Sequence, residues 1–415
     1  MEEIVGKMKG FLQDLHHKYA ALAPNPTPSL VWDLYKTTVE KWLVPIDRQH
    51  QGRTLFPVRE DGSVFVSLAS YRDENCGNTL KEMYSKASNP EKLFAGVVQQ
   101  NCVSQCRTGV LEGGRMEDTD PDPDCYEEFC SSELGAEYCR QGHVRNLFVN
   151  ESESLGPPVA RYLASKLWQG ENFFLQIDAH SFFEQGWDES LVSDIHRTPS
   201  YPMSVLTHYP APHTSKYQNE PGYRICGGDF AKSSIESNII RLGQGTKHDK
   251  AIQKDPCPAP FVGAGFIFSH ASFLGTVPYD PYPAWVFMGE EILLSARLWT
   301  WGWDMYSPTR NVVAHIYIRR HKPKFWETVG RLFKMPGIHN PIQLLIIQRV
   351  KHIVGYPECA TDVLEEPSLL ANLDLYGEGP VRAMEDYMDM VGLDMSAKRS
   401  RSIDWCYSCE SPRPV

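Results

Sequence analysis

The sequence predicts an α/β fold in which a mostly parallel β-sheet is covered by helices on both faces. Short apolar runs, typical of buried strands, alternate along the chain with stretches whose apolar residues have helical spacing. The first such stretch, residues 63–98, indicates a strand, a helix and a second strand, joined by a right-handed crossover. With 42% hydrophobic and 22% charged residues, the chain has the composition of an ordinary globular protein.

The N-terminal residues predict a helix. Apolar side chains recur at spacings of four, three, four and four, which puts them in one stripe: Ile4, Met8, Phe11, Leu15 and Tyr19. This stripe packs either against the main body of the chain or against a second copy in a homodimer. Residues 21–30 contain three prolines and predict a linker. Residues 1–30 are therefore interpreted as an N-terminal helix and linker.

Residues 31–321 are predicted to form the main domain. Strands are expected at residues 63–69, 93–98, 144–149, 173–177, 203–206, 261–268 and 312–314, and helices at residues 78–88, 158–168 and 289–301. Two insertions, residues 101–142 and 208–258, are too long for ordinary connections and are expected to be functional loops or lids. From residue 322 the pattern turns helical, so residues 322–415 are interpreted as a C-terminal helical extension with helices at 325–333, 342–354 and 381–390.

Composition also excludes some partners. The net charge of −11 disfavours binding to duplex DNA, which requires a basic face, so no nucleic acid is expected. The longest apolar run, residues 261–268, is far shorter than the roughly 20 residues of a membrane-spanning helix, so no membrane association is expected.

The eleven cysteines are odd in number and sparse, and the N-terminal residues lack the apolar stretch of a secretion signal. A reducing, cytoplasmic location with unpaired thiols is therefore expected. A redox or zinc site at Cys406-Tyr-Ser-Cys409 is the less favoured interpretation. The sequon at Asn150 is interpreted as a chance match, because glycosylation requires secretion.

The most informative segment is the apolar strand that leads to Asp178 and His180. Residues two apart in an extended chain share a face, so both side chains can reach one ion. One carboxylate and one imidazole leave most of a coordination sphere open, which suits Mn²⁺ or Mg²⁺ bridged to a diphosphate. The alternative is an aspartate that caps the next turn beside an uninvolved histidine. His315 ends another apolar strand and either completes a three-ligand site or is a semi-buried histidine held by hydrogen bonds.

Ligands of parallel sheets bind beyond the carboxyl ends of the strands, which draws attention to residues Ser70 to Asp73 after the first strand. Arginines near the strand ends carry planar forks that suit phosphate, although each could instead form a surface ion pair: Arg72, Arg161 and Arg319.

Two carboxylates, Glu290 and Glu291, open a predicted helix. The helix dipole favours carboxylates there without any function. If this helix end faces a sugar, Glu290 could accept hydrogen bonds from its hydroxyl groups.

Several segments between residues 63 and 320 resemble, in the expected order, the nucleotide-sugar-dependent glycosyltransferases of the GT-A fold. They are VSLASYRDENCGNTL (66–80), FAGVVQQN (94–101), RYLASKLW and FFLQIDAHSFFEQGWD (161–188), FVGAGFIFS (261–269), GEEILLSARLWTWGWDMYSP (289–308) and VVAHIYIRR (312–320). More closely, the chain resembles the cytoplasmic polypeptide N-acetylglucosaminyltransferases of glycosyltransferase family 60, which modify a hydroxyproline on a ubiquitin-ligase adaptor subunit. A looser similarity reaches the mucin-type N-acetylgalactosaminyltransferases, which also have an Asp-x-His metal motif and a later histidine.

The resemblance implies a metal-dependent transfer of GlcNAc from UDP-GlcNAc to a protein hydroxyl, hydroxyproline, with retention. It implies metal ligands at Asp178, His180 and His315, donor-binding residues at Ser70, Arg72, Asp73, Arg161, Gly263, Gly265 and Arg319, and catalytic roles for Glu290 and Glu291. Transfer to a glycan or another protein, and a nucleotide-sugar-binding module without activity, are the alternatives left open.

Overall fold

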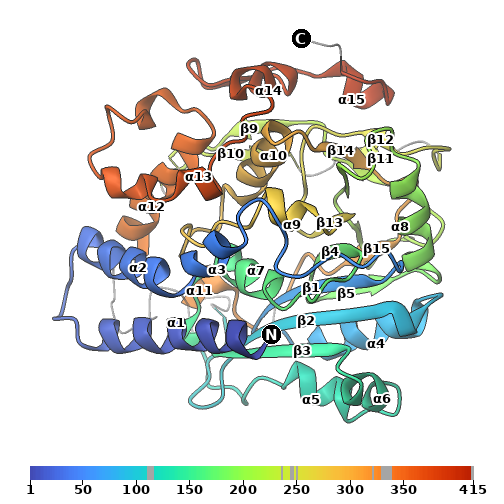
Figure 1. Cartoon of the computed structure of the whole chain (residues 1–415), viewed down its shortest axis with the longest axis horizontal. Helices are drawn as coiled ribbons and strands as arrows, with labels where there is room; N and C mark the ends of the chain where they lie inside the picture. The colour runs from blue at the N-terminus through green and yellow to red at the C-terminus, as the bar shows by residue number, and fades with distance from the viewer. Residues whose placement is uncertain are drawn as a thin grey trace.

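The computed structural model describes residues 1–109, 116–234, 237–243, 247–248, 251–319, 322–328 and 339–412 of the chain. Its centre is an eight-stranded sheet with the order β12-β14-β6-β13-β4-β1-β2-β3 (Figure 1). These strands are β1 (Val64–Tyr71), β2 (Leu93–Asn101), β3 (Val144–Asn150), β4 (Phe173–Asp178), β6 (Ser204–Thr207), β12 (Cys257–Pro258), β13 (Phe266–His270) and β14 (Asp304–Ser307). The α/β fold predicted from the sequence is therefore confirmed.

Most neighbouring strands of this sheet are parallel, as predicted. β3, β2, β1 and β4 run in one direction, and β14 is parallel to β6. β13 runs antiparallel to both β4 and β6, and the short β12 is antiparallel to β14. Because of this reversal, Phe266 at the start of β13 pairs with Ile177 near the end of β4. The loop before β13 therefore lies at the edge where the parallel strands end.

Helices cover both faces of the sheet, with a separate cluster of buried apolar side chains on each face. Phe173 and Leu175 of β4 belong to one cluster and Phe174 to the other, which explains the uninterrupted apolar run in this strand. One cluster includes residues of α4 (Cys76–Lys86), α5 (Cys125–Cys130), α6 (Gly135–Arg140) and α8 (Trp187–His196). The other includes residues of α1 (Glu2–Ala20), α2 (Pro28–Trp42), α7 (Pro157–Ser165), α9 (Phe273–Thr276) and α10 (Glu290–Thr300).

The N-terminal helix packs against its own chain. Met8, Phe11, Leu15 and Tyr19 are buried in the core, and the ring of Tyr19 contacts that of Trp285. The stripe therefore packs against the main body, which confirms the first alternative, and it gives no support to a homodimer. The predicted linker is shorter than residues 21–30, because the Leu30 N–H donates to the Thr27 hydroxyl and Pro28 begins α2. The short α3 (Val44–Gln49) follows.

A small second sheet lies beside the large one. It has the order β5-β15-β7 and consists of β5 (Ser181–Phe183), β7 (Ala211–Pro212) and β15 (Val313–His315). The strand predicted at residues 312–314 therefore forms, but outside the large sheet. β15 is antiparallel to β5, which begins three residues after β4 ends, and this pairing sets His315 opposite Ser181.

The C-terminal part is helical, as predicted. Its elements are α11 (Phe325–Thr328), α12 (His339–Ile353), α13 (Leu373–Tyr376), α14 (Met384–Met390), α15 (Asp404–Ser408) and the short strands β16 (Leu393–Asp394) and β17 (Arg399–Ser400). Residues 329–333 of the helix predicted at 325–333 lie outside the described residues. One apolar cluster extends from Met8 to Leu393, so the N-terminal helices, the sheet and the C-terminal helices share a core.

The insertion at residues 208–258 contains two small hairpin-like pairings. β9 (Gly228–Phe230) pairs with β10 (Ile240–Leu242), and β8 (Tyr223–Arg224) pairs with β11 (Lys247–His248). Among the described residues, no helix combines the length and the apolar character required to cross a membrane.

Ten of the eleven cysteines form disulfides, so the expectation of unpaired thiols is wrong. The pairs are Cys76–Cys125, Cys102–Cys106, Cys130–Cys139, Cys226–Cys406 and Cys257–Cys409, and Cys359 is free and buried. Three of the pairs include cysteines of the first insertion, residues 101–142. The other two tie both ends of the segment between Cys226 and Cys257 to α15. Cys406 and Cys409 therefore form neither a redox pair with each other nor a zinc site.

We expect one titratable thiol per chain when the protein is unfolded in guanidinium without reductant, because Cys359 is the free cysteine. After full reduction we expect eleven. Titration with Ellman's reagent measures both numbers. A count close to eleven before reduction would contradict the pairing.

Candidate functional site

A cavity of about 870 Å³ opens at the edge of the sheet where β1 and β4 end. Its wall is formed by residues from β1, α7, the end of β4, the loop before β13, the start of α10 and the segment after β15. This is the edge at which α/β proteins bind ligands. Of the residues selected from the sequence, the cavity is lined by Asp73, Arg161, Asp178, His180, Gly265, Glu290, Glu291, His315 and Arg319.

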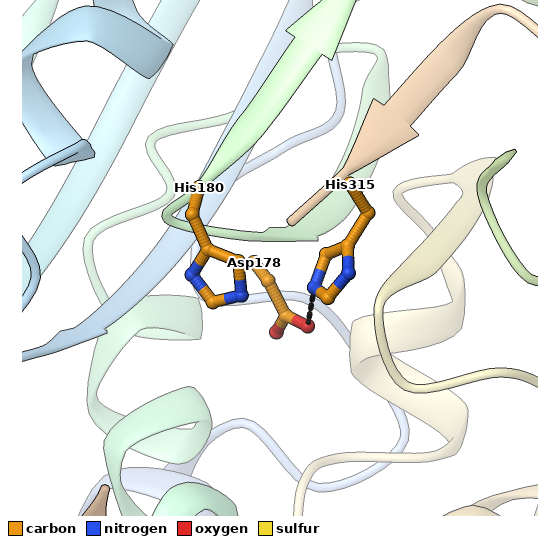
Figure 2. Close-up of side chains that lie close together, drawn as sticks. All are labelled: Asp178, His180 and His315. Atoms are coloured by element: carbon orange, nitrogen blue, oxygen red, sulfur yellow. Dashed lines mark hydrogen bonds and ion pairs between the residues drawn. The ribbon is translucent and has the colours of Figure 1, made fainter. Parts of the chain in front are cut away.

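Three of these side chains meet at one point. Asp178 ends β4, His180 precedes β5 and His315 ends β15, so the β5–β15 pairing brings the later histidine to the Asp-x-His segment. Their potential ligand atoms all lie within 4.8 Å of one another. Figure 2 shows one ring nitrogen of each histidine turned toward Asp178. His315 Nε2 lies 3.0 Å from Asp178 Oδ2.

The charge of Asp178 is compensated by its neighbours. Burial alone would raise the pKa of its carboxyl, but the hydrogen bond with His315 and the charge of Arg161 hold that pKa well below its usual range. Arg161 donates from one terminal nitrogen to Asp178 Oδ1 at 2.9 Å. Burial lowers the pKa of His315. Asp178 is therefore ionised and His315 uncharged around pH 7.

Arg161 connects two carboxylates. It lies in α7 and is buried, and its other terminal nitrogen forms an ion pair of 2.5 Å with Glu290 Oε1. Burial raises the pKa of Glu290 although Arg161 opposes the shift. The alternative of a surface ion pair for Arg161 is therefore wrong.

Asp73 and Arg319 form a second group of charges beside His180. Asp73 Oδ2 lies 2.6 Å from His180 Nδ1 and accepts a hydrogen bond of 2.9 Å from Arg319. Burial opposes ionisation of Asp73, but His180 and Arg319 keep its pKa below the usual value. Arg319 also donates to the carbonyl oxygen of Tyr71, the last residue of β1.

The loop before β13 lies against Asp178. A Cβ on Gly265 would lie 3.2 Å from Asp178 Oδ2, so a glycine allows this close approach. The backbone N–H of Ala264 donates to Glu291 Oε1 at 2.9 Å, and the Tyr209 hydroxyl donates to Glu291 Oε2 at 2.9 Å. Burial raises the pKa of Glu291 to about 7. Glu291 therefore fixes the loop and exchanges a proton near neutral pH.

Three residues selected from the sequence do not line the cavity. Arg72 has a φ of 47° and its buried guanidinium pairs with Asp122 at 2.8 Å and Glu151 at 3.0 Å. Ser70 is buried, and its carbonyl accepts a hydrogen bond from Gln100.

Gly263 packs toward the protein interior, because a Cβ there would lie 2.9 Å from Ile225. Ser70, Arg72 and Gly263 are therefore not part of the cavity wall, and their donor-binding roles stay predictions from the resemblance.

Several cavity residues were not selected from the sequence. Gln100 and Tyr209 follow or end predicted strands, so the strand-end rule could have found both. Ile240 and Leu242 come from β10 of the second insertion, and Trp326 comes from α11. No motif marks these three. The insertion expected to be a functional loop thus contributes to the cavity wall.

Comparison with known proteins identifies a family. A family model described as Glycosyltransferase (GlcNAc) matches residues 63–397, more than half of the chain. The matched range includes every residue of the Asp178, His180 and His315 group.

Two curated proteins are similar over part of their length. The chain is 25% identical to polypeptide N-acetylgalactosaminyltransferase 5 of Caenorhabditis elegans over 49% of this chain and 32% of that protein. It is 24% identical to putative polypeptide N-acetylgalactosaminyltransferase 13 of Drosophila melanogaster over 67% of this chain and 46% of that protein. The chain thus spans less than half the length of these relatives. Among solved structures, GalNAc-T7 with UDP, GalNAc and Mn²⁺ aligns with a TM-score of 0.47 at 14% identity, over 79% of this chain and 56% of that one.

We expect Glu291→Gln to change the pH dependence of stability. The carboxyl has a pKa of 4.5 as a free side chain and about 7 in the folded protein, so the unfolded state loses its proton first as the pH rises. Wild-type stability should therefore decrease between about pH 4.5 and 7, and this loss should be absent from the variant. Urea unfolding at pH 5, 6, 7 and 8 measures the difference, which should grow in favour of Glu291→Gln. The same change at the exposed Glu189 is the control, and parallel curves for wild type and Glu291→Gln would refute the assignment.

Proposed function

The chain belongs to the glycosyltransferase (GlcNAc) family, and from this membership we propose that it transfers GlcNAc from UDP-GlcNAc to a protein hydroxyl. The observation that carries the proposal is the meeting of Asp178, His180 and His315 at the wall of one large cavity. A cavity of about 870 Å³ is in the size range of small-molecule sites and accommodates a nucleotide sugar. Hydroxyproline as the acceptor and retention at the sugar come from the sequence resemblance alone.

The three side chains fit a divalent metal ion. Their donor set is two imidazoles and one carboxylate, close enough to share one ion. Imidazole nitrogen suits Mn²⁺ better than Mg²⁺, which prefers oxygen ligands, so Mn²⁺ is the proposed cofactor. The chemistry that a bound ion supplies is neutralisation of the negative charge on the leaving UDP.

Two guanidinium groups are proposed to stabilise the same negative charge on the leaving UDP. Arg161 and Arg319 line the same cavity as the triad of Asp178, His180 and His315, and they are held by Asp178 and Asp73 respectively. Both are oriented by protein carboxylates before any ligand arrives. Such preorganised groups stabilise developing charge without having to reorient during the reaction.

Glu290 and Glu291 are the proposed contacts to the donor sugar. Both lie in the first turn of α10 and line the cavity. Glu290 is ion-paired with Arg161, so it accepts hydrogen bonds from sugar hydroxyls. Glu291 has a pKa of about 7 and can therefore donate as well as accept at neutral pH. We assign the catalytic part to residues 31–321, with α11 adding Trp326 to the cavity wall.

The disulfides favour a second candidate acceptor. The cytoplasmic location expected from the sequence rested on unpaired thiols as well as on the N-terminal residues, and ten cysteines are paired. Disulfides persist in oxidising compartments, where a hydroxyl on a glycan or on another protein is a more accessible acceptor than a cytoplasmic adaptor. Transfer to such a hydroxyl uses the same donor site.

We expect the wild-type protein with Mn²⁺ to release UDP from UDP-GlcNAc, slowly to water and faster when an acceptor is added. Asp178→Ala should abolish this release because it removes a metal ligand and the partner of His315. The control is Asp304→Asn, because this carboxylate pairs with Arg382 and does not line the cavity. A coupled UDP assay over a panel of UDP-sugars, hydroxyproline peptides and glycans identifies donor and acceptor. Undiminished release by folded Asp178→Ala at limiting Mn²⁺ would disprove the site, and binding of UDP-GlcNAc without any release would mark a non-catalytic module.

We expect Arg161→Lys to lower kcat by about 10²-fold, the typical effect of removing one preorganised donor. Arg161 contacts Asp178 and Glu290 with two different nitrogens, whereas lysine has a single nitrogen and lacks the planar fork. Steady-state kinetics with varied donor separates the effect on kcat from that on KM. Arg382→Lys, at an ion pair that is partly exposed, is the matched control. Wild-type turnover and donor affinity in Arg161→Lys would mean that the phosphate site lies elsewhere.

A further inference from the structure

His180 is held by a carboxylate on the side away from the triad. Its Nδ1 lies 2.6 Å from Asp73 Oδ2. A carboxylate can only accept hydrogen bonds, so Nδ1 carries the hydrogen and the neutral ring keeps its lone pair on Nε2. Figure 2 shows one ring nitrogen of His180 turned toward Asp178 and the other turned away. The contact with Asp73 therefore selects the tautomer in which the nitrogen facing the triad can bind a cation.

Asp73 is itself held at three points. Its Oδ1 accepts a hydrogen bond of 2.9 Å from the backbone N–H of Asn75, and its Oδ2 accepts one of 2.9 Å from Arg319 as well as that from His180. Arg319 is anchored in turn on the carbonyl oxygen of Tyr71. Asp73 is 4% exposed. With both oxygens engaged by the protein, Asp73 is a rigid support for His180 and has little capacity left for a nucleoside.

His315 has no comparable support. Its Nδ1 is buried and, within the described parts of the chain, has no hydrogen-bond partner. Its ring packs against the rings of Tyr317 and His180 instead. The two histidines of the triad are therefore oriented by different means: a carboxylate for His180 and aromatic packing together with strand pairing for His315.

We propose that Asp73 is a positioning residue of the metal site, which fixes the tautomer and orientation of His180, and that Arg319 holds Asp73 in place for this task. This inference rests on the proposed metal site and replaces the expectation that Asp73 binds the donor. Carboxylates that orient a metal-binding histidine typically contribute 10–100-fold to metal affinity. Asp73 acts on the ion only through His180.

The test is the affinity of metal-free protein for Mn²⁺ alone, measured from the free-ion signal in electron paramagnetic resonance, without nucleotide. We expect wild type to bind most tightly, Asp73→Asn more weakly and Asp73→Ala weakest, by about 10–100-fold. The order follows because asparagine keeps an acceptor for Nδ1–H but loses the charge. The matched control is Asp122→Asn, a buried carboxylate that holds the neighbouring Arg72 without touching His180. It should lower thermal stability and leave the Mn²⁺ affinity within about twofold of wild type.

The outcomes separate the two proposals. If wild type binds Mn²⁺ and the folded Asp73 variants bind it equally well, the positioning role is refuted while the metal site stands. If Asp122→Asn weakens Mn²⁺ binding as much as Asp73→Asn does, the effect is general destabilisation and the positioning role is again refuted. If wild type itself does not bind Mn²⁺, both proposals fail. Should Asp73→Ala not fold, the affinity of Asp73→Asn decides.

Discussion

Two guanidinium groups allow three carboxylates to lie close together at one edge of the sheet. Arg161 is shared by Asp178 and Glu290, and Arg319 contacts Asp73. A buried charge without a partner costs several kcal/mol, so removing either arginine would leave carboxylates repelling one another in a poorly hydrated place. Because Arg161 comes from α7 and its partners from β4 and α10, this one ion-pair group also fixes the relative positions of three elements.

Chain reversals complete the site. In a sheet of purely parallel strands, each strand would offer the cavity only the residues that follow it. β13 runs the other way, so the residues that precede it, Ala264 and Gly265, lie against Asp178. β15 is antiparallel to β5, and this pairing carries His315 across 137 residues of sequence to the Asp-x-His segment. The cavity therefore combines residues from strand ends and strand beginnings.

Much of the fold and of the candidate site could be predicted from the sequence wherever the determining signal is local. The alternation of apolar runs and helical spacing predicted six of the eight strands of the large sheet but neither β12 nor β14, and two-residue spacing put Asp178 and His180 on one face. What could not be predicted depends on the direction in which a side chain points or on contact partners that are distant in the sequence. Arg72 follows a strand just as Asp73 does, but its left-handed backbone conformation turns the side chain into the interior toward Asp122. Cysteine pairing is a problem of the same kind, because sequence spacing does not reveal which thiols meet.

The disulfides to α15 have a consequence for how the chain acquires its cavity during synthesis. β10, which lines the cavity, lies between Cys226 and Cys257, and their partners follow 180 and 152 residues later. At about 5–20 residues per second, the ribosome needs on the order of ten seconds or more to supply them. During that interval the central sheet can already assemble, while both cysteines remain available for wrong pairings with each other. Correct closure of this wall is therefore a late event that depends on the arrival of Cys406 and Cys409, and a nascent chain contains Asp178, His180 and His315 before it has the complete cavity around them.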